Sequence, residues 1–410
     1  MSTVNVEPTE EDLDSLPPLV SMDDHVLENP SIWRDRLPAK SRDAGPHVER
    51  ELVTALGDSS AQTWCDVWHY GDVRFQMMRG MAAIDKVHHN ELPVPVTYDD
   101  YRPGAYQIGP RLQDMDEDGV EYSLVFPNTF VRFCGQLFLE AKDRELAMLC
   151  VRAYNDWAIE EFAGNSNGRV VAAAIIPLWD PTAAAQEVRR NAARGCQAVC
   201  FSEIPAWLGL PSLHSGEWDV FFAACQETDT LINMHIGSSS VITTPSMDSP
   251  LMVQIANQYL NASLSLSDWL MSGTLARFDR LRISYAESQA GWIPYIVSRL
   301  DDIWARDKPL YWNPNALDAP PSSFIAGRVF ACVFRDATAF SHPDILGVDN
   351  ICFETDYPHP DSNWPDSRRA AWQQTASLTL DERDKVLRYN GLALLGISAT
   401  QNPMAPSDRA

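Results

Sequence analysis

The chain has 410 residues, of which 45% are hydrophobic, so we expect one large domain or two ordinary ones with a sizeable core. Its 32 Lys and Arg residues against 56 Asp and Glu residues give a net charge of −24. This excess of negative charge argues against nucleic acid and anionic membrane surfaces as partners. We therefore expect the protein to bind a small molecule.

The two ends of the chain are predicted to lie outside the folded body. Residues 1–18 form an acidic segment that lacks the basic start and the apolar stretch of a signal peptide, and residues 397–410 are expected to be a loose tail. No apolar run approaches the roughly 18 residues that span a bilayer. The eight cysteines are scattered without a CxxC pair, which is typical of free, buried thiols in a reducing compartment. These features predict a cytoplasmic protein.

Between residues 19 and 396, short β-rich runs alternate with longer helical patterns. The predicted strands are Leu19–Asp24, Glu121–Phe126, Val171–Leu178, Ala198–Glu203, Leu231–Ile236, Leu281–Glu287, Val329–Arg335 and Asn350–Asp356. Helical patterns between them include Gln136–Ala163, Pro181–Arg194, Trp218–Thr228 and Trp292–Ala305. Eight strand–helix units predict an α/β fold of the (β/α)₈ TIM barrel type rather than an open sheet.

Residues 29–108 interrupt this rhythm after the first predicted strand. The interval is too long for an ordinary strand–helix connection, and it is too rich in Trp, Tyr, His and Met to be disordered. In (β/α)₈ barrels the loops at the carboxyl ends of the strands build the active site. We therefore expect an insertion that packs over this end of the barrel as a lid or pocket wall. Its aromatic residues favour a bulky, partly apolar substrate.

Histidines and an acid are predicted at the ends of the first and fifth strands. Asp23 and His25 form a D-x-H pair, and because side chains alternate along a strand, both point to the same face. His235 closes the fifth strand, where the following Gly and Ser residues leave space around it. Taken singly, these features are more typical of a capping interaction and of a structural histidine.

Carboxylates close the sixth and eighth strands. Glu287 ends the sixth with Tyr285 on the same face, and Asp356 ends the eighth with Glu354 on the same face. A buried carboxylate is costly unless a partner compensates its charge, whereas a solvated strand-end acid is the more common case. His359 follows Asp356 in a Pro turn. We expect it either to hydrogen-bond to a metal ligand or to be a plain turn residue.

Taken together, these strand ends predict a metal site, because all of them lie at the same end of one barrel. Two histidines with carboxylates suit Zn²⁺, Mn²⁺ or iron, and leave positions open for water or substrate. We expect one divalent or trivalent metal ion, with a second ion as the alternative. The expected ligands are Asp23, His25, His235, Glu287 and Asp356.

Five segments carry a family resemblance: Ser21–Val26, Ile176–Leu178, Asn233–Gly237, Ala286–Tyr295 and Glu354–His359. Their motifs resemble those of the amidohydrolase-related (amidohydrolase 2) family, which includes aminocarboxymuconate-semialdehyde decarboxylase and γ-resorcylate decarboxylase. The segments span nearly the whole chain outside residues 29–108. The resemblance implies a distorted TIM barrel with one divalent metal, and it suggests a homodimer.

Two positions depart from the family pattern. The first-strand pair of the family is H-x-H or E-x-H, whereas this chain has the shorter acid Asp23 before His25. Glu287 stands where the decarboxylases have a histidine that assists catalysis. The resemblance places the strand-5 histidine at His235 and the strand-8 aspartate at Asp356. The extra carboxylate of Glu287 also admits a second metal, with Tyr285 as a remote candidate ligand.

Because of the change at Glu287, our first expectation is hydrolysis of an ester, thioester, amide or lactone by a metal-activated water. Asp356 would move the proton, His235 would help to hold the metal, and Glu287 would position the water or a second ion. The alternative is non-oxidative decarboxylation of an aromatic or unsaturated carboxylic acid, with Arg132 and Arg299 as candidate anchors for the acid. Surface or subunit contacts are the more common role for such arginines. A third possibility is a non-catalytic binding module on a retained barrel.

Overall fold

The structure of the chain is a computed structural model, and it describes residues 7–54, 62–83, 92–128, 130–246, 248–307 and 317–400. All eight predicted barrel strands are present in it. They are β1 (Leu19–Val26), β5 (Val120–Pro127), β6 (Val170–Ala172), β7 (Ala198–Phe201), β8 (Leu231–His235), β9 (Ile283–Ala286), β10 (Val329–Val333) and β11 (Ile351–Phe353).

These strands form two parallel sheets that join into one barrel. Strands β1, β5 and β6 pair in one sheet, and β7 to β11 pair in the other. Ala174, just beyond β6, forms a parallel bridge with Val199 of β7. At the opposite seam the main-chain N–H of Asp356 donates to the carbonyl oxygen of Asp23 at 2.9 Å. The eight strands thus make the predicted TIM barrel, with strands as short as three residues.

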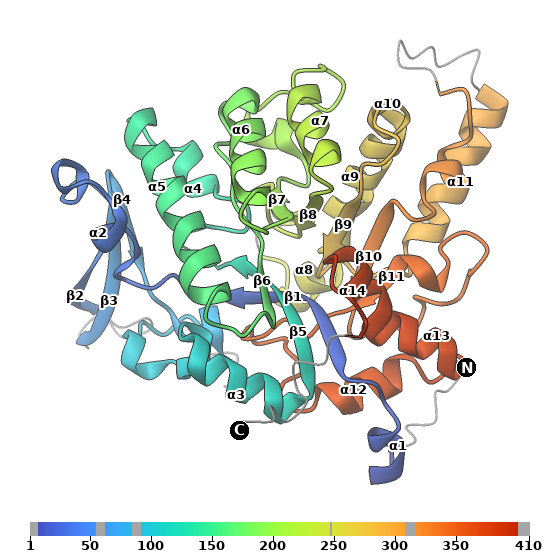
Figure 1. The fold of residues 1–410 in the computed structure, drawn as a ribbon, viewed down its shortest axis with the longest axis horizontal. Helices are drawn as coiled ribbons and strands as arrows, with labels where there is room; N and C mark the ends of the chain where they lie inside the picture. The colour runs from blue at the N-terminus through green and yellow to red at the C-terminus, as the bar shows by residue number, and fades with distance from the viewer. Residues whose placement is uncertain are drawn as a thin grey trace.

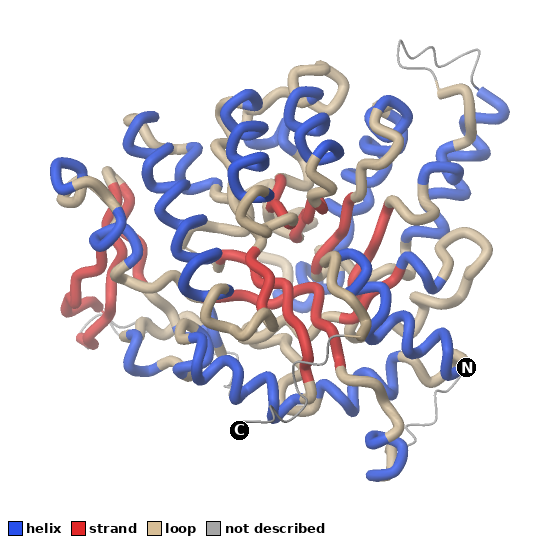
Figure 2. The backbone as a smooth tube through the Cα atoms, viewed as in Figure 1, coloured by secondary structure: helices blue, strands red, loops and turns tan. Residues whose placement is uncertain are grey.

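Nearly all residues of the barrel strands are buried. Every residue of β1, β5, β8, β10 and β11 is buried, and this pattern is typical of parallel strands covered on both faces. Helices surround the strands (Figure 2). They are α1 (Glu10–Asp14), α3 (Ile108–Asp118), α4 (Gln136–Leu139), α5 (Arg144–Trp157), α6 (Pro181–Ala192), α7 (Asp219–Glu227), α8 (Leu251–Ala256), α9 (Tyr259–Met271), α10 (Thr274–Arg277), α11 (Ile293–Asp307), α12 (Ser367–Gln374), α13 (Leu380–Asp384) and α14 (Asn390–Leu394).

The predicted helix over residues 136–163 is divided in two. After α4 the chain leaves the helical path, and Asp143 then begins α5 as an N-cap that accepts a hydrogen bond from the Leu146 N–H at 3.0 Å. Such a cap satisfies a main-chain donor that would otherwise have no partner. The helix continues past Trp157 as a π-helical turn over Ala158–Ala163.

The insertion after β1 contains a small antiparallel sheet of β2 (His47–Thr54), β3 (Gln62–Tyr70) and β4 (Val73–Gln76), beside α2 (Ile32–Arg36). The sheet stands to one side of the barrel (Figure 1). Trp68 of β3 attaches it to the barrel, because its ring stacks on Phe130 with centroids 4.4 Å apart and meets Trp33 edge-on at 5.2 Å. The sequence predicted an insertion here, but not these strands.

All eight cysteines are buried and free of disulfides, as expected. Among the helices that the structure describes, none combines the length and the apolar character needed to cross a membrane.

Candidate functional site

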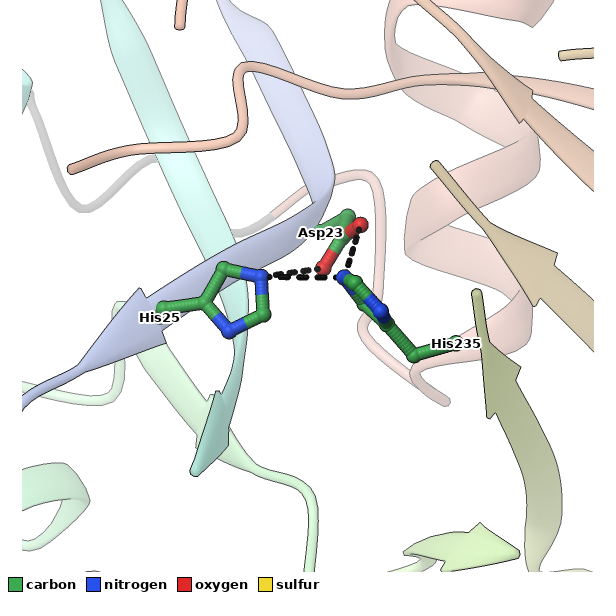
Figure 3. A group of neighbouring side chains, drawn as sticks. All are labelled: Asp23, His25 and His235. Atoms are coloured by element: carbon green, nitrogen blue, oxygen red, sulfur yellow. Dashed lines mark hydrogen bonds and ion pairs between the residues drawn. The ribbon is translucent and has the colours of Figure 1, made fainter. Parts of the chain in front are cut away.

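Three side chains meet at the end of the barrel where β1 and β8 finish (Figure 3). Asp23 and His25 come from β1, and His235 is the last residue of β8. The Nε2 atoms of the two histidines are 3.1 Å apart. One carboxylate oxygen of Asp23 lies 3.4 Å from Nε2 of His25, and the other lies 3.3 Å from Nε2 of His235. All three side chains are buried.

The hydrogen bonds of the two histidines decide which ring nitrogen faces the group. Nδ1 of His25 contacts the carbonyl oxygen of Pro127 at 3.2 Å, and Nδ1 of His235 contacts that of Ile236 at 2.6 Å. A carbonyl oxygen only accepts, so each Nδ1 carries the proton and each Nε2 presents a lone pair. Two lone pairs at 3.1 Å repel one another unless a cation lies between them.

Two carboxylates from other strands complete the group. Oε2 of Glu287 lies 3.3 Å from Nε2 of His235, and Oδ1 of Asp356 lies 3.5 Å from Nε2 of His25. Asp23, Glu287 and Asp356 each offer an oxygen within 4.8 Å of the others. The structure therefore brings together all five predicted ligands.

His359 stands directly behind Asp356. Its Nδ1 lies 2.8 Å from Oδ1 of Asp356, and its ring stacks on that of His25 with centroids 4.0 Å apart. The Nδ2 amide of Asn128 lies 3.4 Å from Nε2 of His359. Because the amide is a donor, Nε2 accepts and Nδ1–H donates to Asp356. His359 thus makes the hydrogen bond to Asp356 that the sequence offered as one of two possibilities, and a role toward a metal stays a prediction.

Burial without counter-charge dominates the electrostatics of the group. Burial raises the pKa of Asp23 and Asp356 well above the usual range, and burial together with Asp356 raises the pKa of Glu287 to about 8. Burial lowers the pKa of His25 and of His235, so both imidazoles are neutral. Both oxygens of Asp23 and Oδ2 of Asp356 lack a hydrogen-bond partner. Neutral imidazoles and unsatisfied carboxylate oxygens fit a bound divalent cation.

The backbone turns sharply at two of the ligands. Glu287 and Asp356 have φ of 56° and 54°, in the left-handed region that non-glycine residues seldom adopt. The main-chain N–H of Glu287 donates to Glu354 at 2.9 Å, which holds that turn against β11. Positions of this kind persist only when surrounding contacts impose them, and they are concentrated at functional sites.

This turn overturns one expectation from strand alternation. Tyr285 was predicted to share a face with Glu287 and was a remote candidate ligand for a second metal. Its hydroxyl instead pairs with Ser265 of α9 at 3.0 Å, and its side chain is buried there. Alternation stops at Ala286, because the left-handed residue that follows redirects the Glu287 side chain.

The two predicted arginine anchors have carboxylate partners of their own. Arg132 pairs with Glu140 at 2.7 Å and reaches Ser240 at 3.4 Å. Arg299 lies on α11 and pairs with Asp302 at 2.6 Å, with half of its side chain exposed. Neither arginine is among the described residues that line the cavity at the site.

Sequence reasoning missed the residue that aligns these ligands. Asp24 is buried and accepts hydrogen bonds from Thr355 Oγ1 at 2.5 Å, from the Tyr357 N–H at 3.0 Å and from the Ser123 hydroxyl. These partners lie on β5 and beyond β11, so one carboxylate ties two segments to β1 beside the site. Its position between Asp23 and His25, in a strand predicted to be buried, was the available signal, because an unpaired buried acid is costly.

A cavity of about 1150 Å³ opens at the group. Glu287, Asp356 and His359 contribute to one part of its wall. Met78, Met81 and residues 92–94 of the insertion contribute to another. The structure thus offers a cation site at the edge of a large, mainly apolar chamber.

Residues 63–397 match the family model for amidohydrolases. The chain belongs to the amidohydrolase family. The match begins after β1, so the assignment of Asp23 and His25 as ligands rests on the geometry given above. With this family and this donor set, the protein is a metal-dependent enzyme of the amidohydrolase superfamily.

Several solved structures share the fold. An amidohydrolase from Mycobacterium avium subsp. paratuberculosis superposes with a TM-score of 0.71 at 21% identity, over 92% of this chain and 99% of that one. The 2,6-dihydroxybenzoate decarboxylase from Rhizobium has a TM-score of 0.57 at 18% identity, over 93% and 99%. A manganese-bound 5-carboxyvanillate decarboxylase from Novosphingobium aromaticivorans has a TM-score of 0.58 at 17% identity, over 72% and 82%.

Proposed function

We propose that this enzyme is a metal-dependent, non-oxidative decarboxylase of an aromatic or unsaturated carboxylic acid. The observation that carries the proposal is the meeting of the His25–His235–Asp23 group with the Asp356–His359 pair at the wall of an apolar cavity. Decarboxylases of aromatic acids among the similar structures support it, including one with bound manganese. This reverses the order of our two expectations from sequence, in which hydrolysis came first.

The residues that would hold the metal are His25, His235, Asp23 and Asp356, with Glu287 at its edge. A divalent ion bound there supplies positive charge for the substrate carboxylate and a neighbouring oxygen. That charge matters because the described lining of the cavity contains no lysine or arginine.

Asp356 is placed to deliver the proton that decarboxylation requires. The bond between the substrate carbon and its carboxylate breaks, carbon dioxide leaves, and a new bond to hydrogen forms at the same carbon. Oδ2 of Asp356 has no hydrogen-bond partner and Oδ1 is held by His359, so the carboxyl group faces the cavity in a fixed orientation. Burial raises the pKa of Asp356, whereas a bound cation would favour its carboxylate form, so Asp356 would pass the proton on rather than keep it. His359 is placed to return a proton to it from solvent.

The test is release of carbon dioxide from a panel of hydroxybenzoic and unsaturated acids by manganese-loaded protein. In D₂O the product should carry one deuterium at the carbon that lost the carboxylate. Asp356→Asn should lower kcat by roughly 10²–10⁴-fold with the fold intact. Asp361→Asn is the matched control, because Asp361 also lines the cavity but is half exposed and paired with Arg335. Equal activity of Asp356→Asn and wild type would refute the role of Asp356.

Hydrolysis is the second candidate function, and one observation favours it. The carboxylates of Asp23, Glu287 and Asp356 gather in one place, and an uncharged ester or lactone would bring no further negative charge to them. The extra carboxylate of Glu287 also suits a second ion or an activated water. Reaction of an ester panel in ¹⁸O-labelled water separates the candidates, because only hydrolysis places the labelled oxygen in the acid product.

A further inference from the structure

The size of the cavity at the site exceeds what a single-ring acid needs. Pockets that bury most of a drug-sized ligand commonly measure about 300–1,000 Å³. The cavity here measures about 1150 Å³. A substrate of one aromatic ring would leave most of this apolar space to water, which weakens binding because apolar walls remain hydrated.

Apolar side chains continue from inside the cavity to the short helix α8 at its mouth. Leu251 and Ile255 of α8 line the cavity although 40% and 48% of their surfaces are exposed. Met252 beside them is 80% exposed, and no residue of α8 is buried. Val241 and Ile242, in the segment after β8, add to the same lining and are 41% and 59% exposed. A contiguous exposed patch of this kind marks a binding surface.

Ionisable side chains make up only a small part of the cavity wall. Ionisable side chains in its described lining are confined to Glu287, Asp356, His359 and Asp361. The rest of the described lining is mainly Leu, Ile, Val, Met and Pro side chains, with Thr243, Gln258 and Asn261 among its polar members. None of the described lining residues is Lys or Arg, so an anionic group of a ligand would have to be neutralised by the metal.

We propose that the substrate is an amphiphile, with a compact acidic head at the metal end and a long alkyl or polycyclic body that runs along the cavity to Leu251 and Ile255 of α8. The identity of the head rests on the proposed function. The apolar body rests on the cavity alone.

Binding of a series of ligands with increasing chain length tests the apolar part of the proposed substrate separately from the decarboxylation reaction. The probes are salicylate and its derivatives with a methyl, butyl, hexyl or octyl group para to the carboxylate. The Kd of each compound for manganese-loaded protein is measured by equilibrium dialysis. Mass spectrometry of the dialysed compound then shows whether it was bound unchanged or converted to product. Affinity should rise by roughly fourfold for each methylene that the cavity buries. A constant Kd from salicylate to octyl-salicylate would overturn the proposal.

Two leucine-to-serine variants test whether the alkyl chain of the ligand lies against α8. Leu251→Ser should weaken octyl-salicylate by roughly tenfold, with a loss that grows with chain length. Leu264→Ser is the control, because Leu264 is 54% exposed on α9 and does not line the cavity. Equal effects of the two variants would contradict the placement of the body. A change of oligomeric state in Leu251→Ser, measured by sedimentation, would assign the patch to a second copy of the chain and likewise overturn the proposal.

The outcomes also separate this inference from the proposed function. Tight binding of long-chain probes without release of carbon dioxide would support the amphiphile and refute decarboxylation of these acids. Decarboxylation of small acids with no gain from a longer chain would support the reaction and refute the amphiphile.

Discussion

The two buried histidines have the same arrangement, and it determines what they can bind. Each directs its Nδ1–H to a main-chain carbonyl oxygen, and each presents Nε2 to the space shared with Asp23. Such a contact fixes both the tautomer and the orientation of a metal-binding ring. The shared space is therefore built for a cation rather than for a proton.

Removal of one of these rings should abolish metal binding. We expect His235→Ala to lose the metal during purification, because the group would keep the carboxylates of Asp23 and Glu287 but only one imidazole, that of His25. Metal content by inductively coupled plasma mass spectrometry is the measurement. His214→Ala is the control, since His214 is 40% exposed and pairs with a single carboxylate, that of Asp268. Full metal content in His235→Ala would refute the site.

At this scale the sequence predicted which residues meet but not how they turn. Strand ends and residue types were sufficient to bring Asp23, His235 and Asp356 together. The orientation of the Glu287 side chain was not predictable, because nothing in the residue types around a glutamate indicates that it will adopt a positive φ. That backbone angle separates Glu287 from Tyr285, which alternation had placed beside it.

At the scale of elements, Asp24 joins β1 to β5 and to the segment after β11. We expect Asp24→Ala to destabilise the protein by about 3–5 kcal/mol, since Ser123, Thr355 and the Tyr357 N–H would lose a buried, charged acceptor. Urea unfolding measures this loss. Asp35→Ala should change stability by less than about 0.5 kcal/mol, because Asp35 is exposed on α2. Equal stability of the two variants would contradict the role of Asp24.

A second link between elements should make stability depend on pH. Asp118 at the end of α3 accepts a hydrogen bond from the Ser367 N–H of α12 at 2.9 Å, and burial raises its pKa to about 7. The folded state therefore binds a proton that the unfolded chain releases near pH 4, so this contribution to stability is lost as pH rises from about 4 to 7. Asp118→Asn should remove this part of the dependence. The free energy of unfolding of the wild type and of Asp118→Asn is measured by urea titration at several pH values. The same pH dependence in both proteins would contradict this role of Asp118.

The elements of the insertion were the least predictable. Strand β2 has only one buried residue, so its alternation signal is weak in sequence. The stability of antiparallel strands with one solvated face also depends on the side chains that cover the other face. Here Trp33 and Phe130 pack against Trp68 of β3. The insertion histidines His88 and His89 lie outside the described residues, as do residues 1–6 and 401–410.

For the whole molecule, metal binding should appear as thermal stability. A ligand at 100 times its Kd adds about 2.7 kcal/mol to a fold that binds it only when folded. Chelation should therefore lower the Tm of the metal-loaded wild type, and Mn²⁺ should restore it. His235→Ala should show the lower Tm with or without chelator. An unchanged Tm of the wild type after complete metal removal would contradict a link between the ion and the fold.

The barrel as a whole was predictable because eight apolar runs recur between helices. Its parallel strands end on one side, which also made the metal site predictable. The cavity was not, because its described lining includes residues 78–81, 92–94, 236–243 and 251–261, which no local pattern relates to one another. The size of the chamber therefore follows only from the folded chain.

The seam between β1 and β11 has a consequence for synthesis of the protein. The hydrogen bonds that close the barrel there join Asp23 and His25 to Asp356 and Tyr357. Asp23, His25 and Asp356 are also among the candidate metal ligands, so two distant parts of the chain would have to meet before an ion could find this site. On the ribosome, the early ligands emerge long before Asp356. A nascent chain would acquire metal late, when the barrel closes.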